Sequence, residues 1–350
     1  MIELLSNVFG DSGDKVLMNN GDPSILRPFV GKDGRSYVTV NENGQRKVVL
    51  TNTPATLSRD AWIQFDNAII RALRDRLKAY TDLRAAGLTY NLPNGMAHTM
   101  LQYQTLGDIT SATISMDPIR RSERDRPEID VVNLPLPIVH KDFDFSAREI
   151  LASRQGQMAL DTTTAEMAAR KVGEEIEKML VGTVTPFTYG GASVYGYITF
   201  PYRSTKTNMT IPTGSNGTTV VNDFLALRQL LMDNNHPGPY MVYVNTQWAQ
   251  YLDNDFSTAK GDQTLRQRLL AVEGIQGIRT LDYLPNTRWH VLMVEMSTET
   301  VRAINGMEVQ TVQWESGGGM MKHFKVMAMQ VPQLRADTAG NSGIAHGTSS

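Results

Sequence analysis

Residues 132–150 read VNLPLPIVHKDFDFSAREI, and this stretch decides how the rest of the chain is interpreted. Apolar side chains occupy every second position from 132 to 138, which is the period-two pattern of a β-strand. The prolines at positions 135 and 137 cannot donate to a strand ladder, so the pattern predicts an edge strand or an extended arm. A short helix is predicted to follow over residues 146–154.

A run of charged residues lies immediately before this strand. Residues 120–128 read RRSERDRPE, in which seven of nine side chains are charged. Ahead of the run, Ala112, Ile114 and Met116 alternate with hydroxyl residues, which predicts another strand. We therefore expect residues 96–139 to form a long two-stranded arm with a charged far end.

That far end is either simply solvated or in contact with a neighbouring subunit. A long arm buries little surface against its own chain, so a partner would explain why it is ordered. The candidate inter-subunit contacts are Arg120, Arg121, Glu123, Arg124, Asp125, Arg126 and Glu128.

Two long amphipathic helices are predicted on either side of the arm. Over residues 58–86, apolar side chains recur in steps of three and four, and Gly87 is a natural stop. The second helix covers residues 161–181, where Thr163 and Glu166 match a capping box. Both patterns are typical of core helices.

The remaining segments predict smaller elements. Asn43-Gly44 lies between two β-prone runs and indicates a hairpin over residues 37–50, within a polar N-terminal arm. Residues 183–306 mix short strands and helices, which predicts an α/β unit. Two strands, over 308–314 and 320–331, are expected to pair across a glycine-rich turn. The segment 337–350 has little apolar content, and we expect it to be mobile.

The composition limits the class of protein. A chain of 350 residues with 41% hydrophobic and 20% charged side chains is ordinary for a globular protein with a sizeable core. The absence of cysteine excludes disulfides, thiolate metal sites and cysteine nucleophiles. A formal net charge of −2 argues against broad electrostatic wrapping of DNA. No secretory signal or membrane span is expected.

A search for catalytic and binding motifs is negative. The chain has no phosphate-binding or dinucleotide-binding glycine signature. Gly191-Ala192-Ser193-Val194-Tyr195 lacks the final glycine of a nucleophile elbow, and the six histidines have no metal-ligand spacing. We expect no catalytic, cofactor-binding or metal-binding residues and no enzyme activity. A two-domain enzyme whose site is assembled from distant residues stays open as a third hypothesis.

The order of elements, together with several short stretches, resembles the Hong Kong 97-like fold of tailed-phage major capsid proteins and encapsulin shell proteins. Residues 134–143 with 146–150 resemble the segment that leads from the extended loop into the peripheral domain. The stretch 82–88 resembles the helix before that loop, and 160–180 resembles the spine helix. Segments 196–199 and 274–278 resemble parts of the axial domain, so the resemblance spans residues 57–335.

This resemblance implies an α+β fold with six parts. They are an N-terminal arm (1–58), a helix preceding the loop (59–95), the extended loop (96–139), a peripheral domain (140–185 and 308–335), an axial domain (186–307) and a flexible tail (336–350). Some relatives weld their subunits through a lysine on the extended loop. Residues 96–140 contain no lysine, so that isopeptide cross-link is not expected.

The function implied by the resemblance is that of a major capsid protein. Its copies would assemble as pentamers and hexamers into the icosahedral shell around the double-stranded DNA of a tailed phage. Implied partners are portal, scaffold and decoration proteins, with weak non-specific contact to packaged DNA. The expected location is the virion, and the host cytoplasm during assembly. The alternative is an encapsulin nanocompartment shell enclosing a cargo enzyme, and the long N-terminal arm favours the phage.

Overall fold

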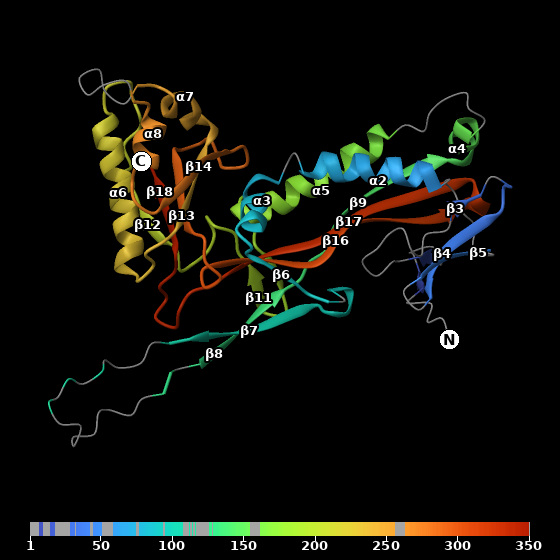
Figure 1. Ribbon diagram of the computed structural model, residues 1–350, viewed down its shortest axis with the longest axis horizontal. Helices are drawn as coiled ribbons and strands as arrows, with labels where there is room; N and C mark the ends of the chain where they lie inside the picture. The colour runs from blue at the N-terminus through green and yellow to red at the C-terminus, as the bar shows by residue number, and fades with distance from the viewer. Residues whose placement is uncertain are drawn as a thin grey trace.

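The computed structural model describes residues 7–9, 15–17, 29–31, 33–42, 45–50, 59–74, 77–93, 95–107, 112, 114, 116, 126–127, 129–154, 162–255 and 263–349. Within these ranges the molecule has an α/β body at one end and a long sheet with helices laid along it at the other (Figure 1). A thin two-stranded arm projects below the junction of these two parts. The mixture of helices and sheets confirms the α+β class.

The helices are α2 (Arg59–Arg74), α3 (Lys78–Ala85), α4 (Ala147–Arg154), α5 (Thr163–Val181), α6 (Gly217–Asp233), α7 (Ala249–Leu252) and α8 (Leu265–Leu270), with 3₁₀ turns η1 (Gly95–Ala97), η2 (Thr246–Trp248) and η3 (Gly317–Gly319). The strands are β1 (Asn7–Phe9), β2 (Lys15–Leu17), β3 (Phe29–Val30), β4 (Ser36–Glu42), β5 (Gln45–Leu50), β6 (Thr89–Asn91), β7 (Met100–Leu106), β8 (Ile129–Pro135), β9 (Val139–Ser146), β10 (Phe187–Tyr189), β11 (Ala192–Val194), β12 (Ser204–Lys206), β13 (Tyr240–Asn245), β14 (Ile275–Leu281), β15 (His290–Glu295), β16 (Val301–Ser316), β17 (Met321–Leu334) and β18 (Ile344–Thr348).

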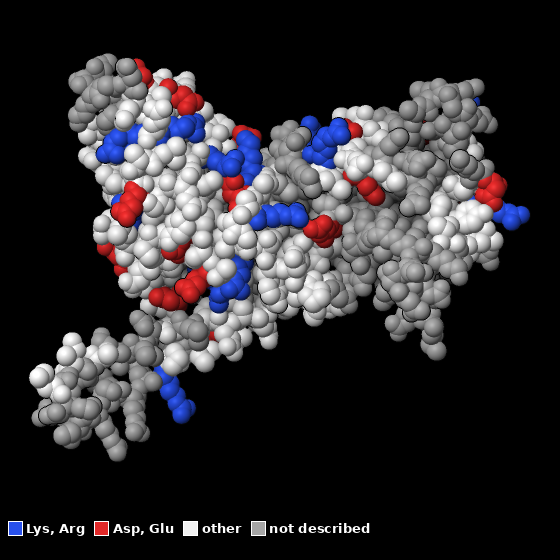
Figure 2. All heavy atoms as spheres, in the orientation of Figure 1, with Lys and Arg blue, Asp and Glu red and all other residues white. Residues whose placement is uncertain are grey.

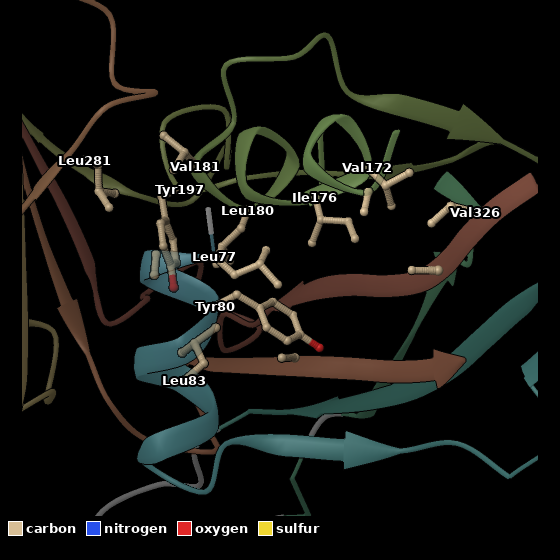
Figure 3. Close-up of a cluster of buried hydrophobic side chains, with 14 of the residues drawn as sticks. Leu77, Tyr80, Leu83, Val172, Ile176, Leu180, Val181, Tyr197, Leu281 and Val326 are labelled. Atoms are coloured by element: carbon tan, nitrogen blue, oxygen red, sulfur yellow. The ribbon is translucent and has the colours of Figure 1, made fainter. Parts of the chain in front are cut away.

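The long sheet has the strand order β6-β16-β17-β9. Its centre is the predicted hairpin, which is confirmed with longer strands, and the turn passes through Gly317–Gly319 at positive φ, where a side chain would be strained. Helix α5 lies along one face of this sheet (Figure 1). In Figure 3, Val172, Ile176 and Leu180 of α5 point toward Tyr80 of α3 and Val326 of the sheet, and this cluster is the main core.

The helix predicted over residues 58–86 is wrong in one respect, because the structure divides it into α2 and α3. Leu77 precedes α3 with φ −88° and ψ 79°, which is outside the helical region. The first backbone N–H groups of α3 then point at the buried carboxylate of Glu177, as described below. A side chain distant in sequence therefore starts a new helix where the local apolar pattern continues without a break.

The capping box predicted at Thr163 and Glu166 is also wrong. Helix α5 begins at Thr163, two residues after the predicted start at residue 161. Its N-cap is Thr162, whose hydroxyl donates to the Glu166 carboxylate instead of accepting a backbone N–H. A capping box is present at α8, where Thr264 and Gln267 exchange side-chain to backbone hydrogen bonds.

The expectation that residues 337–350 form a mobile tail is wrong. Residues 344–348 form β18, which lies in the five-stranded sheet β12-β18-β15-β13-β14 of the α/β body. It pairs antiparallel with β15 and parallel with β12. Its small residues fit beneath α6, where Gly347 lies against Met209 and Leu227. Low apolar content therefore reflects close packing at this position, not exposure to solvent.

The two-stranded arm is confirmed, but its first strand is β7, at residues 100–106, and not the predicted strand at residues 112–116. Strand β7 pairs antiparallel with β8 in a separate two-stranded sheet. Residues 112, 114 and 116, predicted as a strand, have no strand conformation.

Two other elements complete the comparison with the predicted pattern. The N-terminal hairpin at Asn43-Gly44 is confirmed as β4 and β5. The long helix α6 was not predicted.

Candidate inter-subunit surfaces

The charged end of the arm lies almost entirely outside the described residues. Of the seven predicted contact residues, only Arg126 is described, and its side chain is exposed. Arg120, Arg121, Glu123, Arg124, Asp125 and Glu128 remain predictions. Two apolar side chains of the arm, Ile114 and Met116, are 99% and 100% exposed. Such exposure of apolar groups on a projecting segment is typical of a surface that another chain covers.

The two faces of the arm differ in burial. Leu101, Tyr103 and Leu134 share one face and pack against the long sheet and β11. Ile129 and Val131 point the other way and are more than half exposed. The alternation of a strand places these sets on opposite faces, so the base of the arm is anchored while its outer face stays apolar and open.

Arg335 fixes the base of the arm. Its guanidinium lies 5.6 Å from the centre of the Tyr103 ring, and its Nη2 donates to the Gln104 carbonyl at 2.9 Å. The Tyr103 hydroxyl donates to the Leu334 carbonyl at 3.3 Å. Burial and the neighbouring Arg302 lower the pKa of Arg335, which nevertheless stays charged in proteins. The sequence carries no local signal for this contact.

A groove of about 610 Å³ lies between the arm and the rest of the molecule. Its walls come from β8, the β10–β11 turn and the segments around Tyr202 and Asp337. Ile129 and Val131 are among the β8 residues that border it. The groove is also bordered by Tyr103 and Thr105 of β7 and by Pro332 and Leu334 of β17, and it is open along one side.

Ser316, His323 and Asp144 form a hydrogen-bonded chain with the connectivity of a hydrolase triad. His323 Nε2 lies 2.5 Å from Ser316 Oγ, and His323 Nδ1 lies 2.5 Å from Asp144 Oδ1. The imidazole stacks on Trp314, and the groove described above is lined by other residues. Since the chain joins β9, β16 and β17 at an open sheet surface, we interpret it as a cross-strand link.

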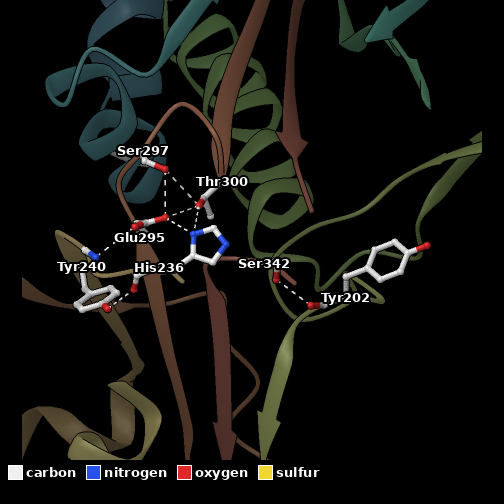
Figure 4. Close-up of polar contacts among 8 residues, drawn as sticks. Tyr202, His236, Tyr240, Glu295, Ser297, Thr300 and Ser342 are labelled. Atoms are coloured by element: carbon white, nitrogen blue, oxygen red, sulfur yellow. Dashed lines mark hydrogen bonds and ion pairs between the residues drawn. The ribbon is translucent and has the colours of Figure 1, made fainter. Parts of the chain in front are cut away.

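A second polar cluster joins the α/β body to the long sheet (Figure 4). Glu295 is buried, and its Oε2 lies 2.6 Å from His236 Nδ1 and accepts from the Thr300 hydroxyl at 2.7 Å. Burial alone would raise the pKa of Glu295, but the hydrogen bonds from His236 and Thr300 outweigh it and hold that pKa below the ordinary value. The hydroxyls of Ser297 and Thr300 both donate to the Glu295 carboxylate, so the cluster ties the segment before β16 to the end of β15.

Two further histidines are partners of each other in the sheet of the α/β body. His290 and His346 stack with ring centres 5.3 Å apart, and His290 Nδ1 lies 3.0 Å from His346 Nε2. Burial, His290 and Arg203 together lower the pKa of His346 to about 3. Across the described ranges, no three His, Asp or Glu side chains gather in a way that could hold a metal ion.

Charges of both signs are interspersed over the face shown in Figure 2. Among the described residues this face carries no extended basic area of the kind that wraps DNA. In the part of the chain that the structure describes, no helix combines the length and apolar character needed to cross a membrane.

The comparison with solved structures identifies the fold. A virus-like particle from Pyrococcus furiosus matches with a TM-score of 0.57 and 12% identity, covering 81% of this chain and 98% of that chain. The capsid of Myoviridae Phage XM1 matches with a TM-score of 0.57 and 10% identity, covering 76% and 90%. Mycobacterium phage Bobi matches with a TM-score of 0.55 and 11% identity, covering 77% and 90%. The expected resemblance to capsid and encapsulin-like shell proteins is thereby confirmed for the fold.

No curated protein matches the sequence. A family model does match it, over residues 52–347, and that model is described as a family of unknown function, DUF6260. The matched region begins before α2 and ends within β18, so it includes the arm, the long sheet and the α/β body. The chain therefore belongs to the DUF6260 family and has the fold of phage capsid proteins.

Proposed function

We propose that this chain is the major capsid protein of a tailed phage, and that its copies assemble into the icosahedral shell enclosing double-stranded DNA. The observation that carries this proposal is the projecting β7–β8 arm with its exposed apolar outer face, on a fold shared with phage capsids. An isolated monomer would leave that face in water. Repeated heterologous contacts whose rotations close produce a shell.

In this proposal the parts of the chain take the roles named above, with one change. The long sheet and α5 belong to the peripheral domain (140–185 and 308–335), and the body at 186–307 is the axial domain. The segment 336–350 is assigned to the axial domain as well, because β18 lies in its sheet. Residues 96–139 are the extended loop, 59–95 the helical segment before it, and 1–58 the N-terminal arm.

The proposed partners follow from the same assignment. Pentamers and hexamers of the chain would form the shell, with portal, scaffold and decoration proteins added during assembly in the host cytoplasm. Packaged DNA would be contacted weakly and without sequence preference, because the described charges are mixed in sign. The role is structural, and assembly takes the place of catalytic turnover.

An encapsulin-type compartment is the second candidate. The observation that favours it is the Pyrococcus furiosus virus-like particle, of which 98% is covered by the match. The long N-terminal segment before α2 favours the phage, since a segment of that length can reach neighbouring subunits.

Expression of the chain alone, size fractionation and electron microscopy of the heaviest fraction test the proposal. Uniform hollow shells are the expected result. Packaged DNA in native particles would support the phage capsid, and an enclosed enzyme would support the compartment. A chain that stays monomeric both alone and with the neighbouring gene products of its source would contradict both candidates.

A further inference from the structure

Helix α3 is held between α5 and the sheet of the α/β body by two buried carboxylates. The first, Glu177 of α5, is fully buried and accepts from the backbone N–H groups of Ala79 at 2.6 Å and Tyr80 at 3.3 Å. Within the described part of the chain, no Lys or Arg forms an ion pair with Glu177. By contrast Glu174, one turn earlier, lies within 4 Å of both Arg170 and Lys171.

The second carboxylate, Asp82, lies on α3 and faces the α/β body. Its Oδ1 is 3.0 Å from Arg279 Nε on β14, and its Oδ2 accepts from the Tyr243 hydroxyl on β13 at 3.3 Å. Lys78, at the start of α3, adds an ion pair with Asp282 just beyond β14 at 2.9 Å. Thus α3 contacts α5 through Glu177 and the α/β body through Asp82 and Lys78.

The interior around the two carboxylates favours the binding of a proton. Burial disfavours a charged carboxylate, and a second negative charge close by adds to that cost. Burial and the charge of Asp82 raise the pKa of Glu177, which reaches about 7 although the N–H groups of Ala79 and Tyr80 act in the opposite direction. The charge of Asp82 therefore acts on the pKa of Glu177 in the same direction as burial.

The charged and titratable groups that face this pair come from every element packed on it. Tyr80 and Lys78 lie on α3, Tyr243 and Arg279 on β13 and β14, and Tyr197 in the turn after β11. The Tyr197 hydroxyl is buried without a hydrogen-bond partner among the described residues, and its ring stacks on Tyr243. Arg279 is the one cation paired with the cluster in the described ranges, and it is engaged by Asp82.

We propose that Glu177 and Asp82 form a proton-dependent joint between α5, α3 and the α/β body. With a proton bound at Glu177, the pair carries one negative charge, which Arg279 balances, and α3 is held firmly. Loss of that proton leaves two charges in the interior. The cost of burying the second charge then exceeds the gain from the stronger hydrogen bonds that an ionised carboxylate accepts from the α3 N–H groups, so the hold of α5 on α3 weakens. Because α3 leads directly into β6 and the arm, the proton controls how firmly the arm and the α/β body are fixed relative to the spine helix α5.

The consequence of the joint for a shell rests on the proposed function. In a shell, subunits must adjust the orientation of the α/β body relative to α5. Hydrogen–deuterium exchange measures how firmly α3 is held. The quantity compared is the protection of the peptide spanning residues 77–83 relative to its intrinsic exchange rate at each pH. In the wild-type chain we expect protection to fall about tenfold between pH 6 and pH 8.5. Glu175→Gln, which changes an exposed carboxylate on the same helix, is expected to behave as wild type.

Glu177→Gln is expected to give protection that changes less than twofold over that range. Asp82→Asn is expected to move the midpoint of the wild-type change to lower pH, and it carries the test if Glu177→Gln does not fold. A fall in protection that persists unchanged in Glu177→Gln, or an unmoved midpoint in Asp82→Asn, would overturn the proposal. Shell diameter measured by solution scattering at the two pH values is a separate readout. Failure to form shells would count against the proposed function, whereas the exchange data alone decide the joint.

Discussion

The carboxylate of Glu177 on α5 accepts a 2.6 Å hydrogen bond from the backbone N–H of Ala79, which lies 98 positions earlier in the chain. This contact gives α3 its starting point, since the side chain of the N-cap residue Leu77 accepts no hydrogen bond. One buried acid thereby connects α5, the longest of the described helices, to the segment that leads into the arm. It also makes the stability of this junction depend on pH.

The first prediction concerns that dependence. The pKa of Glu177 is about 7 in the folded chain against 4.5 ordinarily, so the folded state binds the proton more tightly. The contribution is fully present below pH 4.5 and is lost as pH rises through 7, a difference of about 3 kcal/mol in the free energy of unfolding. Urea unfolding of wild type and Glu177→Gln should show a gap that changes by about 2 kcal/mol between pH 5.5 and 8.5. A constant gap would contradict this.

The stacked histidines His290 of β15 and His346 of β18 should change the free energy of unfolding with pH in the opposite direction. Burial, His290 and Arg203 lower the pKa of His346 to about 3, so the unfolded chain binds the proton more tightly. Stability is therefore present above pH 6.5 and lost as pH falls through 3, by about 5 kcal/mol in total. Replacing His346 by Gln should flatten the acid limb of the unfolding profile, while His98→Gln, at an exposed histidine, should leave it unchanged.

Strand β18 should be required for the α/β body. A methyl group added at Gly347 would overlap the Met209 sulfur and crowd Leu227. We expect Gly347→Ala to lower the free energy of unfolding by about 1–3 kcal/mol. Gly214→Ala is the matched control, because its added methyl meets nothing within 4 Å. Thermal unfolding of the two variants compares them, and equal melting temperatures would mean that β18 is not packed as described.

The contact of Arg335 with the arm should control local opening of β7. Lysine cannot both stack on Tyr103 and hold the Gln104 carbonyl in the same geometry. Arg335→Lys is expected to speed exchange of the amides at residues 103–106 by about tenfold, which corresponds to about 1.4 kcal/mol. Arg148→Lys, at an exposed arginine of α4, should have no effect on those amides.

The charged end of the arm should decide assembly. Reversing Arg120, Arg121, Arg124 and Arg126 to Glu is expected to impair shell formation while leaving the monomer folded. Single exposed pairs contribute about 0–1 kcal/mol, but a shell repeats each of them many times. A second variant reverses Glu123, Asp125 and Glu128 to Lys. Mixing the two variants should restore shells seen by electron microscopy if the two charge sets meet across subunits, and normal shells from the first variant alone would refute the idea.

The existence of α5 and its C-terminal end, the β4–β5 and β16–β17 hairpins and the existence of a two-stranded arm could be predicted from the sequence. Each of these depends on a pattern contained within a short stretch of sequence. The patterns are apolar residues at helical spacing, Asn43-Gly44 at a turn, and alternating apolar residues with prolines between them. The resemblance of the chain to capsid and shell proteins was confirmed at the level of the fold. The absence of cysteine likewise excluded whole classes of site from the sequence alone.

Only the tertiary structure decided where α3 begins, that residues 344–348 enter a sheet, and that Arg335 holds Tyr103. Each of these depends on a partner far away in the chain: Glu177 for α3, β12 and β15 for β18, and the arm for Arg335. A carboxylate in an amphipathic helix has the same local signature whether it is solvated or buried. Its protonation and its role are set by the groups that folding places around it, which no local pattern encodes.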